Sequence, residues 1–317
     1  MIEEVELKWI SGFWRRVGAL IIDTLILGVT GLLLGLLFER YFVEMAGWGR
    51  LVGFAIALIY FSVMNSSIAG GQTIGKKILD LRVVDSNNAP ISFSKSVLRY
   101  FILAVPFLLN GAQFSNEVLF SFLMYPISLV LFGGILSILY LYIFNRMTRQ
   151  SLHDLAVGSY VVNSYLDKKE LEKVWKPHFV VIVLLLTAAA VAPAFTAQLA
   201  QQGTFKDMLV VQSALSHTPD VTYSTITTGS SRMTSTQEGT REALFVSVNA
   251  FLKTDSVKNV ELARELAKIV INNYSDAQEK DTLLINLIYG YDIGISAKWS
   301  NYTHRFTPRE LKNLDYL

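Results

Sequence analysis

The residues of this chain that are best placed to do chemistry are an aspartate and an arginine at one long apolar segment. Asp23 lies inside the run of residues 17–38, and Arg16 directly precedes this run. A run of this length spans a bilayer, where a carboxylate near the middle of a helix costs roughly 2.5–3.5 kcal/mol. Lipid offers this charge no partner, so we expect Asp23 to face protein or water. An ionisable group in this position is a candidate functional site.

The spacing of the two residues suggests that they act together. Seven positions separate Arg16 from Asp23. Two helical turns place both side chains on one face of a helix, about 10 Å apart along its axis. Two interpretations carry equal weight. In the first, Asp23 binds a proton or an ion and Arg16 is its counter-charge. In the second, the two residues form a structural ion pair that orders a helix bundle.

The composition is that of an integral membrane protein. Of 317 residues, 52% are hydrophobic and 17% are charged, and the mean hydropathy is +0.39. The basic residues cluster beside apolar segments, so the net charge of +2 does not indicate nucleic-acid binding. The absence of cysteine excludes disulfides, thiolate metal sites and cysteine nucleophiles. No nucleophile–base arrangement or metal-ligand spacing is evident. We therefore expect that the protein is not an enzyme and binds no metal and no cofactor. Its expected partner is the lipid bilayer.

Five candidate spans follow from the apolar runs. They are residues 17–38, residues 51–69, two spans within residues 100–144, and residues 179–198. The first run is too long for a signal peptide, which predicts an uncleaved anchor. Pro106 lies in the first limb of the 100–144 region, so that limb either crosses the bilayer or is re-entrant or tilted.

The charges predict the orientation of these spans. The loops on either side of residues 100–144 are both basic, so both should be cytoplasmic, and residues 100–144 then form a helical hairpin. The loop at 39–50 is charge-neutral and fits the outer side. The fifth span leaves the cytoplasm, which places everything after it outside. We therefore expect a bacterial inner-membrane protein with a cytoplasmic N-terminus. The basic residues are Lys76, Lys77, Arg82, Lys95 and Arg99 before the hairpin, and Arg146, Arg149, Lys168, Lys169, Lys173 and Lys176 after it.

The C-terminal part reads as a separate soluble domain. Strand-like alternation at 221–228, 243–252 and 282–289 surrounds an amphipathic helix at 256–274, and a further helix is expected at 206–216. Thr307 and Glu310 have the spacing of a capping box. We predict a membrane all-α bundle of about five transmembrane helices (1–165), a linker with the fifth helix (166–200), and a soluble α+β domain (201–317). One helix alone is expected to join that domain to the membrane part.

A glycine-rich loop follows the second span. Gly71, Gly75 and Lys76 resemble part of a phosphate-binding loop, but Lys77 stands where such a loop needs Ser or Thr, so we reject nucleotide binding. The glycines instead permit a tight turn on leaving the bilayer, and both lysines can lie at anionic headgroups. A short strand is expected next, over the segment that carries Arg82 and Asp85.

A third polar block follows the fourth span. Arg149, His153 and Asp154 lie within helical reach of one another at the membrane surface. His153 has the chemistry to titrate near neutral pH. The alternative interpretation is a solvated cap that serves as a positive-inside anchor.

Taken together, these three blocks resemble the RDD family of bacterial membrane proteins, which is named for one arginine and two aspartates. The resemblance covers roughly residues 13–162. It implies that the named arginine is Arg16 or Arg15 and that the aspartates are Asp23 and Asp154. The family is described as of uncertain function, with transport suggested and cation/proton antiport attributed to some members. The fifth span and the C-terminal part are additions to this unit, and no family is recognised for the latter.

Two hypotheses of function follow. The first is transport of a cation or small solute, coupled to protons through Asp23. The second is a membrane-anchored envelope module that binds, senses or assembles through its exported domain, either with an envelope partner or as a homo-oligomer. The aromatic residues near the C-terminus are the candidate contact surface: Tyr289, Tyr291, Trp299, Tyr302 and Phe306.

Overall fold

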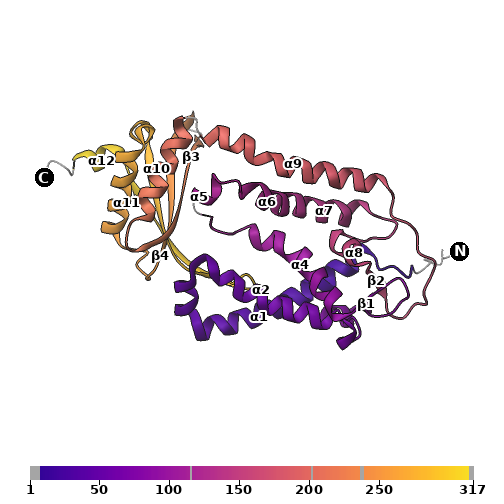
Figure 1. The fold of residues 1–317 in the computed structure, drawn as a ribbon. Helices are drawn as coiled ribbons and strands as arrows, with labels where there is room; N and C mark the ends of the chain where they lie inside the picture. Colours follow the sequence, from indigo (N-terminus) through magenta and orange to yellow (C-terminus); the bar gives the residue numbers. More distant parts are fainter. Residues whose placement is uncertain (1–7, 115, 201–202, 236–238, 314–317) are drawn as a thin grey trace.

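The structure, a computed structural model, describes residues 8–114, 116–200, 203–235 and 239–313. A helical bundle forms one end, and a sheet-rich C-terminal part forms the other (Figure 1). The long helices of the bundle run toward the sheet-rich part (Figure 1), as expected of helices that cross a membrane. The expected combination of a helical membrane part and a C-terminal part with a sheet is therefore confirmed at this level.

The first helix shows why Asp23 is buried. Helix α1 (Phe13–Met45) is kinked at Phe38, continues beyond the predicted span, and is followed by η1 (Ala46–Gly49) and α2 (Arg50–Met64). One stripe of α1 is buried, with members three or four positions apart, while most of its leucines other than Leu27 point outward to where lipid lies. The buried stripe consists of Arg16, Ala19, Asp23, Leu27, Gly31 and Gly35. Arg16 and Asp23 share this face, as their spacing predicts.

The middle of the chain folds back on the first two helices. A two-stranded antiparallel sheet pairs β1 (Leu81–Val84) with β2 (Tyr160–Asn163) and so brings the second and third polar blocks of the sequence together. The other elements are η2 (Ser67–Ala69), α3 (Ile74–Ile78), α4 (Phe93–Leu109), α5 (Asn116–Leu119), α6 (Met124–Ser128), the π-helix η3 (Leu129–Gly133), α7 (Gly134–Phe144), α8 (Leu152–Val157) and α9 (Pro177–Ala200).

Three segments of the described chain are long and apolar enough to cross a membrane. They are Phe13–Met64, which contains α1 and α2, then Met124–Phe144 and Pro177–Thr196. They coincide with the expected first and second spans, with the second limb of the 100–144 hairpin, and with the fifth span. The expected third span corresponds to α4, which has 17 residues, contains Pro106 and is not one of the three segments.

The C-terminal part contains a four-stranded sheet in the order β3-β4-β5-β6, with β4 and β5 parallel and the other pairs antiparallel. Val246, Ile285 and Leu266 are among the buried residues of the core that the sheet forms with α10 and α11. The elements are α10 (Gly203–Ser216), β3 (Val221–Ser235), β4 (Gly239–Leu252), α11 (Val260–Asn273), η4 (Ser275–Glu279), β5 (Thr282–Asp292), β6 (Ala297–Phe306) and α12 (Pro308–Asn313).

Most of these elements match the predicted segments, and β6 is the exception. Its residues are almost all exposed, so its sequence lacks the apolar alternation that reveals a half-buried strand. The predicted capping box is present, because Thr307 N donates to Glu310 Oε2 at 3.0 Å and Glu310 N donates to Thr307 Oγ1 at 3.3 Å.

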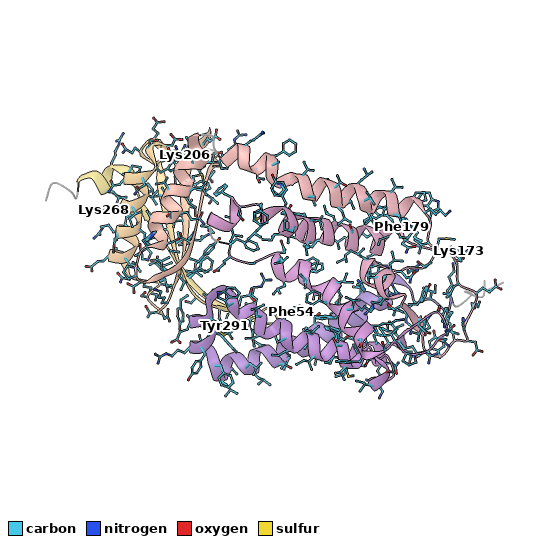
Figure 2. All side chains as sticks on the ribbon, viewed as in Figure 1. Phe54, Lys173, Phe179, Lys206, Lys268 and Tyr291 are labelled. Carbon is cyan, nitrogen blue, oxygen red and sulfur yellow. The ribbon has the colours of Figure 1, made fainter. Side chains whose placement is uncertain are left out.

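The expectation that one helix alone joins the C-terminal part to the bundle is wrong. The end of the β5–β6 hairpin leaves the sheet and enters the bundle beside α2 (Figure 1). Tyr291 on this hairpin lies next to the helix that carries Phe54 (Figure 2), and its ring centroid is 5.5 Å from that of Phe42 in α1. The two ends of the molecule are therefore in direct contact through β5 and β6.

Candidate functional site

The carboxylate of Asp23 is fully buried and accepts three hydrogen bonds, one from α2 and two from the glycine-rich loop with α3. Tyr60 Oη of α2 and the Gly75 backbone N of α3 donate to Oδ1, each at 2.8 Å. Thr73 Oγ1 donates to Oδ2 at 2.6 Å. We call Asp23, Tyr60, Thr73 and Gly75 the Asp23 site. Its carboxylate joins α1, α2 and the glycine-rich loop at one point.

The glycine-rich loop is shaped to deliver these donors. Gly71 has a φ of +77°, and a Cβ there would collide with the Val83 carbonyl oxygen. Thr73 is the N-cap of α3 and accepts from Lys76 N at 3.2 Å. A Cβ at Gly75 would collide with the Ala19 carbonyl oxygen, so glycine lets α3 pack directly on α1. The predicted tight turn is present, and its function in this fold is to reach Asp23.

The structure does not bring Arg16 and Asp23 together. Arg16 Nη1 donates to the Arg149 carbonyl, and Nη2 donates to the Val161 carbonyl at 3.3 Å. Its neighbour Arg15 points to the small sheet, where Nη1 donates to Asn163 Oδ1 at 2.7 Å. Of the two arginines that the resemblance left open, Arg16 is the buried one, and it binds one backbone carbonyl of the third block and one of β2.

Asp154 forms its ion pair with a residue that sequence reasoning counted only as a loop charge. Arg99 Nη2 in α4 lies 2.8 Å from Asp154 Oδ1, and Ser159 Oγ donates to the same oxygen at 2.8 Å. Asp154 also completes a capping box with Ser151 at the start of α8. Arg149 precedes α8 with a φ of +52° and so is not within helical reach of His153 or Asp154 on one helix. We call Arg16, Arg99, His153 and Asp154 the Arg99–Asp154 cluster.

Burial and neighbouring charges shift the pKa values in this cluster. Burial lowers the pKa of His153 to about 3, and Asp154 opposes this only in part. Burial also disfavours the Asp154 carboxylate, but the positive charge of Arg99 and smaller contributions from His153 and Arg16 hold its pKa well below the usual range. At neutral pH the imidazole is therefore neutral, and the ion pair is formed.

The remaining candidate residues of the glycine-rich block divide between the interior and the surface. Burial, together with the nearby charge of Arg99, lowers the pKa of Lys76 to about 7, whereas Lys77 is exposed. Arg82 donates to Asn88 Oδ1 at 3.1 Å, and Asp85 Oδ1 accepts from the backbone N of Ala89 at 3.0 Å. Arg82 and Asp85 thus organise the turn after β1. Lys76 is the member of this block whose charge interacts with both Asp23 and Asp154.

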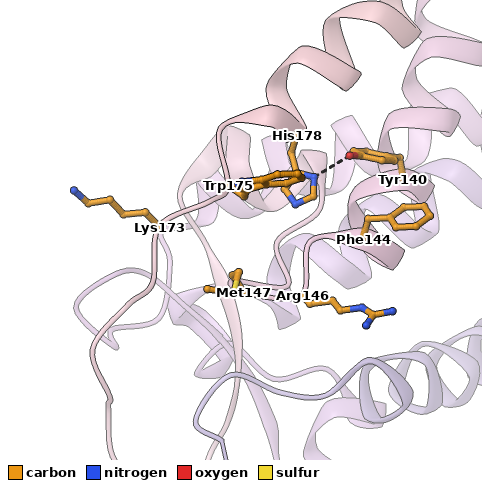
Figure 3. A pocket seen from close by; sticks show the side chains of 7 residues that line it. All are labelled: Tyr140, Phe144, Arg146, Met147, Lys173, Trp175 and His178. Carbon is orange, nitrogen blue, oxygen red and sulfur yellow. Dashed lines mark hydrogen bonds between the residues drawn. The ribbon is translucent and has the colours of Figure 1, made fainter.

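A second feature lies at the start of α9. A pocket of about 500 Å³ opens there (Figure 3). The Tyr140 hydroxyl and His178 Nδ1 are 2.9 Å apart on its wall. Nothing in the spacing of Tyr140 and His178 along the sequence indicates that α7 and α9 bring these two side chains together. The pocket is lined by Tyr140, Phe144, Arg146, Met147, Lys173, Trp175 and His178.

Within the described residues, no three His, Asp or Glu side chains gather in a way that would hold a metal ion. The interactions that the site does show are buried hydrogen bonds at Asp23 and a buried ion pair at Asp154. Tyr60, Thr73 and Arg99 are the residues that sequence reasoning missed. Thr73 had a signal, since it occupies an N-cap position in the glycine-rich block, whereas Tyr60 and Arg99 had none beyond their residue types.

The fold and the site define a multi-helix membrane protein whose polar residues gather inside its bundle. Residues 10–158 match the model of the RDD family, so this part of the chain is similar to that family of membrane proteins. The three blocks that carry the resemblance are the ones that the structure brings to the Asp23 site and the Arg99–Asp154 cluster. Comparisons with curated proteins and with solved structures found no match.

Proposed function

We propose that this protein moves a cation or small solute across the bacterial inner membrane, coupled to protons through Asp23. It is not an enzyme in this proposal. It spans the membrane about five times, with the N-terminus in the cytoplasm. The bundle (1–165) is followed by a linker with the fifth helix (166–200), and the C-terminal domain (201–317) lies outside.

The three hydrogen bonds on Asp23 are the observation that carries this proposal. A carboxylate accepts only, whereas a carboxylic acid carries a proton of its own. Three donors already face its two oxygens. Protonating Oδ1 sets a hydrogen against the Gly75 N–H, which cannot accept, or against Tyr60 Oη, and protonating Oδ2 requires the Thr73 hydroxyl to change from donor to acceptor. Proton binding at Asp23 therefore rearranges the hydrogen bonds that join α1 to α2 and to the glycine-rich loop, and in our proposal this rearrangement moves one of these neighbours.

Lys76 supports the same proposal from the cytoplasmic side. Its pKa of about 7 makes it able to exchange a proton near neutral pH, and its charge interacts with Asp23. It lies one position after Gly75, which donates to that carboxylate. Ionisable side chains inside or beside membrane helices mark ion pathways and proton relays, and in our proposal Lys76 and Asp23 form such a pathway.

The test is proton flux in proteoliposomes that carry a cation gradient, with a pH-sensitive dye inside. Wild-type protein should move protons only in the presence of the transported cation. Asp23→Asn should insert normally and reduce the flux by about ten-fold or more, because it can neither bind nor release a proton. Glu44→Gln is the matched control on the same helix, since that side chain is exposed. Wild-type flux in the Asp23→Asn protein would refute the proposal.

The second candidate is an envelope module that binds or assembles through the exported domain. The contact of the β5–β6 hairpin with the bundle favours it, because that contact gives the domain a route to the membrane part. Trp299 and Tyr302 remain 46% and 47% exposed and are available to a partner, whereas Tyr291 is buried against the bundle. A bundle that ends before Phe179 discriminates between the two, since a transporter would retain flux and an envelope module would show none.

A further inference from the structure

The β5–β6 hairpin extends well beyond the sheet that it belongs to. Strand β5 pairs with β4 only as far as Ile288. It continues to pair with β6 as far as Asp292, opposite Ala297. The turn is closed by Ile293 N, which donates to the Ser296 carbonyl at 3.0 Å. A ribbon of two strands has little stability alone, so it requires a surface to pack on.

That surface is a groove between α1 and α2 whose walls carry glycine. A Cβ at Gly53 in α2 would collide with the Ile293 carbonyl oxygen. A Cβ at Gly31 in α1 would lie 2.6 Å from Ser296 Cβ, and one at Gly35 would collide with the Tyr291 hydroxyl. The missing side chains thus create the space that the ribbon fills. The small-residue pair in α1, which would otherwise suggest helix packing, receives the hairpin.

The tip of the hairpin reaches close to the Asp23 site. Ile295 packs on the cluster formed by Leu27, Ala57 and Phe61, and Tyr60 belongs to the same cluster. Tyr60 in turn donates to Asp23. On α1, the tip contacts Gly28, five residues from Asp23, which corresponds to about 7 Å along the helix.

Charged pairs hold the hairpin at the rim of the groove. Lys298 Nζ lies 2.7 Å from Glu39 Oε2, and the two side chains are 59% and 32% exposed. Arg50 Nε lies 3.6 Å from Asp292 Oδ2. The partly exposed Lys298–Glu39 pair contributes little and exchanges readily with water. Arg50 is less exposed, at 19% against 39% for Asp292, but the 3.6 Å between its Nε and the carboxylate is longer than a hydrogen bond. The ribbon keeps its own backbone hydrogen bonds, so its removal from the groove breaks no strand pairing.

We propose that the β5–β6 hairpin is a removable plug, which closes the outer entrance to the α1–α2 groove and opens the Tyr60–Asp23 pair to the outside when it withdraws. One part of this inference rests on the proposed transport function: a plugged groove should block proton exchange between Asp23 and the outside. The position and movement of the hairpin are testable without any transport.

A disulfide tests the consequence directly, since the chain has no cysteine of its own. Ile295 Cγ1 lies 3.0 Å from a Cβ built at Gly31, and a sulfur in a disulfide lies about 3.0 Å from the far Cβ. The variant is Gly31→Cys with Ile295→Cys, and Ser296→Gly to clear the nearby Cβ. The control moves the first cysteine to Leu32, which is 54% exposed on the lipid side.

The two variants are compared in the full chain in proteoliposomes. Oxidation should abolish cation-dependent proton flux in the Gly31→Cys variant, and reductant should restore it, while the Leu32→Cys control stays unchanged. Full flux in protein that is completely cross-linked would overturn the plug and leave transport standing. Absence of flux in the wild-type protein would instead overturn the proposed transport function. In that case the plug is tested by the cysteine-labelling experiment described next, which needs no transport.

Accessibility is measured with Ala57→Cys, which lies beneath Ile295, and a membrane-impermeant maleimide added outside. Gly53→Leu fills the place of the Ile293 carbonyl and should raise the labelling rate by about five-fold or more. Gly28→Ala is the matched control, because its Cβ would meet the Ile295 carbonyl oxygen at an ordinary 3.7 Å. Equal labelling rates in the Gly53→Leu and Gly28→Ala proteins would overturn the proposal that the hairpin is a plug.

A second variant covers the case in which Gly53→Leu fails to fold. Glu39→Lys places two like charges at the exposed rim and should also speed labelling of the Ala57→Cys protein. Adding Lys298→Glu restores the attraction and should slow it again. If labelling is the same in the single and double charge variants and in the parent, the hairpin does not leave the groove, and the proposal fails.

Discussion

Arg99 places both Nε, at 2.9 Å, and Nη2, at 2.8 Å, on a single oxygen, Oδ1, of Asp154. The pair joins α4 to α8 across 55 positions of the chain, and both side chains are almost completely buried. Buried pairs of this kind are costly to break from one side, because an unpaired charge remains in a medium that cannot solvate it. The pair therefore sets how α4 and α8 sit together.

Asp154→Asn and Arg99→Gln should each destabilise the protein by about 3–5 kcal/mol. The apolar double variant Arg99→Met with Asp154→Leu should cost clearly less than the sum, since it strands no charge. Unfolding in detergent micelles, followed as a double-mutant cycle, measures this coupling. The exposed pair Arg40–Glu44 is the control and should contribute only about 0.5 kcal/mol. Simple additivity at Arg99 and Asp154 would contradict the prediction.

Stability should fall between neutral pH and pH 5 because of His153. Its folded pKa of about 3 lies below its unfolded value of 6.5, so in this range the unfolded chain binds the extra proton. The free energy of unfolding should then drop by up to about 1.4 kcal/mol per pH unit below pH 6.5. The lowered pKa of Asp154 acts further down, where stability present above its unfolded pKa of 3.8 is lost as the pH falls.

Thermal melts in detergent at about pH 5 and pH 7.5 check this dependence. His153→Gln should flatten the difference between the two values, whereas His217→Gln, at an exposed position, should keep the wild-type difference. An unchanged difference in the His153→Gln protein would show that another group is responsible.

The C-terminal domain, residues 203–317, should fold by itself with a cooperative thermal transition. It has its own core, in which Leu266 and Ile285 are completely buried. In isolation the hairpin loses its groove and exposes Ile293 and Ile295, so weak self-association is expected. Serine at both positions should abolish that association, while Val260→Ser, at an exposed site on α11, should leave it unchanged. Sedimentation measures the self-association of the three proteins. A non-cooperative thermal melt would refute independent folding of the domain.

A phosphatase reporter should be active when fused after Leu317 and inactive when fused at Asn88. The reason is that basic loops on both sides of residues 100–144 favour the cytoplasm, and an odd number of spans then exports the C-terminus. Matched expression levels serve as the control. Activity at Asn88, or none after Leu317, would contradict the five-span arrangement.

Local chemistry made much of the fold predictable. The apolar run around Asp23, the cap at Thr307 and the glycine turn before Lys76 depend on residues that are close in the sequence, and the structure has the corresponding helix, cap and turn. The buried face shared by Arg16 and Asp23 follows from helical periodicity alone. The resemblance to the RDD family likewise rests on short ordered blocks, and all three lie within the residues that match the family model.

The partners of the charged residues were decided by tertiary structure. The sequence by itself determined that Asp23 lies in a membrane helix and on its buried side. Only the tertiary structure gave it Tyr60 and Thr73 in place of Arg16, and placed the β5–β6 hairpin against Gly53. The physical reason is that a buried polar group accepts whichever donor the packing brings within 3 Å or so. That choice depends on how helices and strands distant in the sequence approach one another, which spacing along one element does not encode.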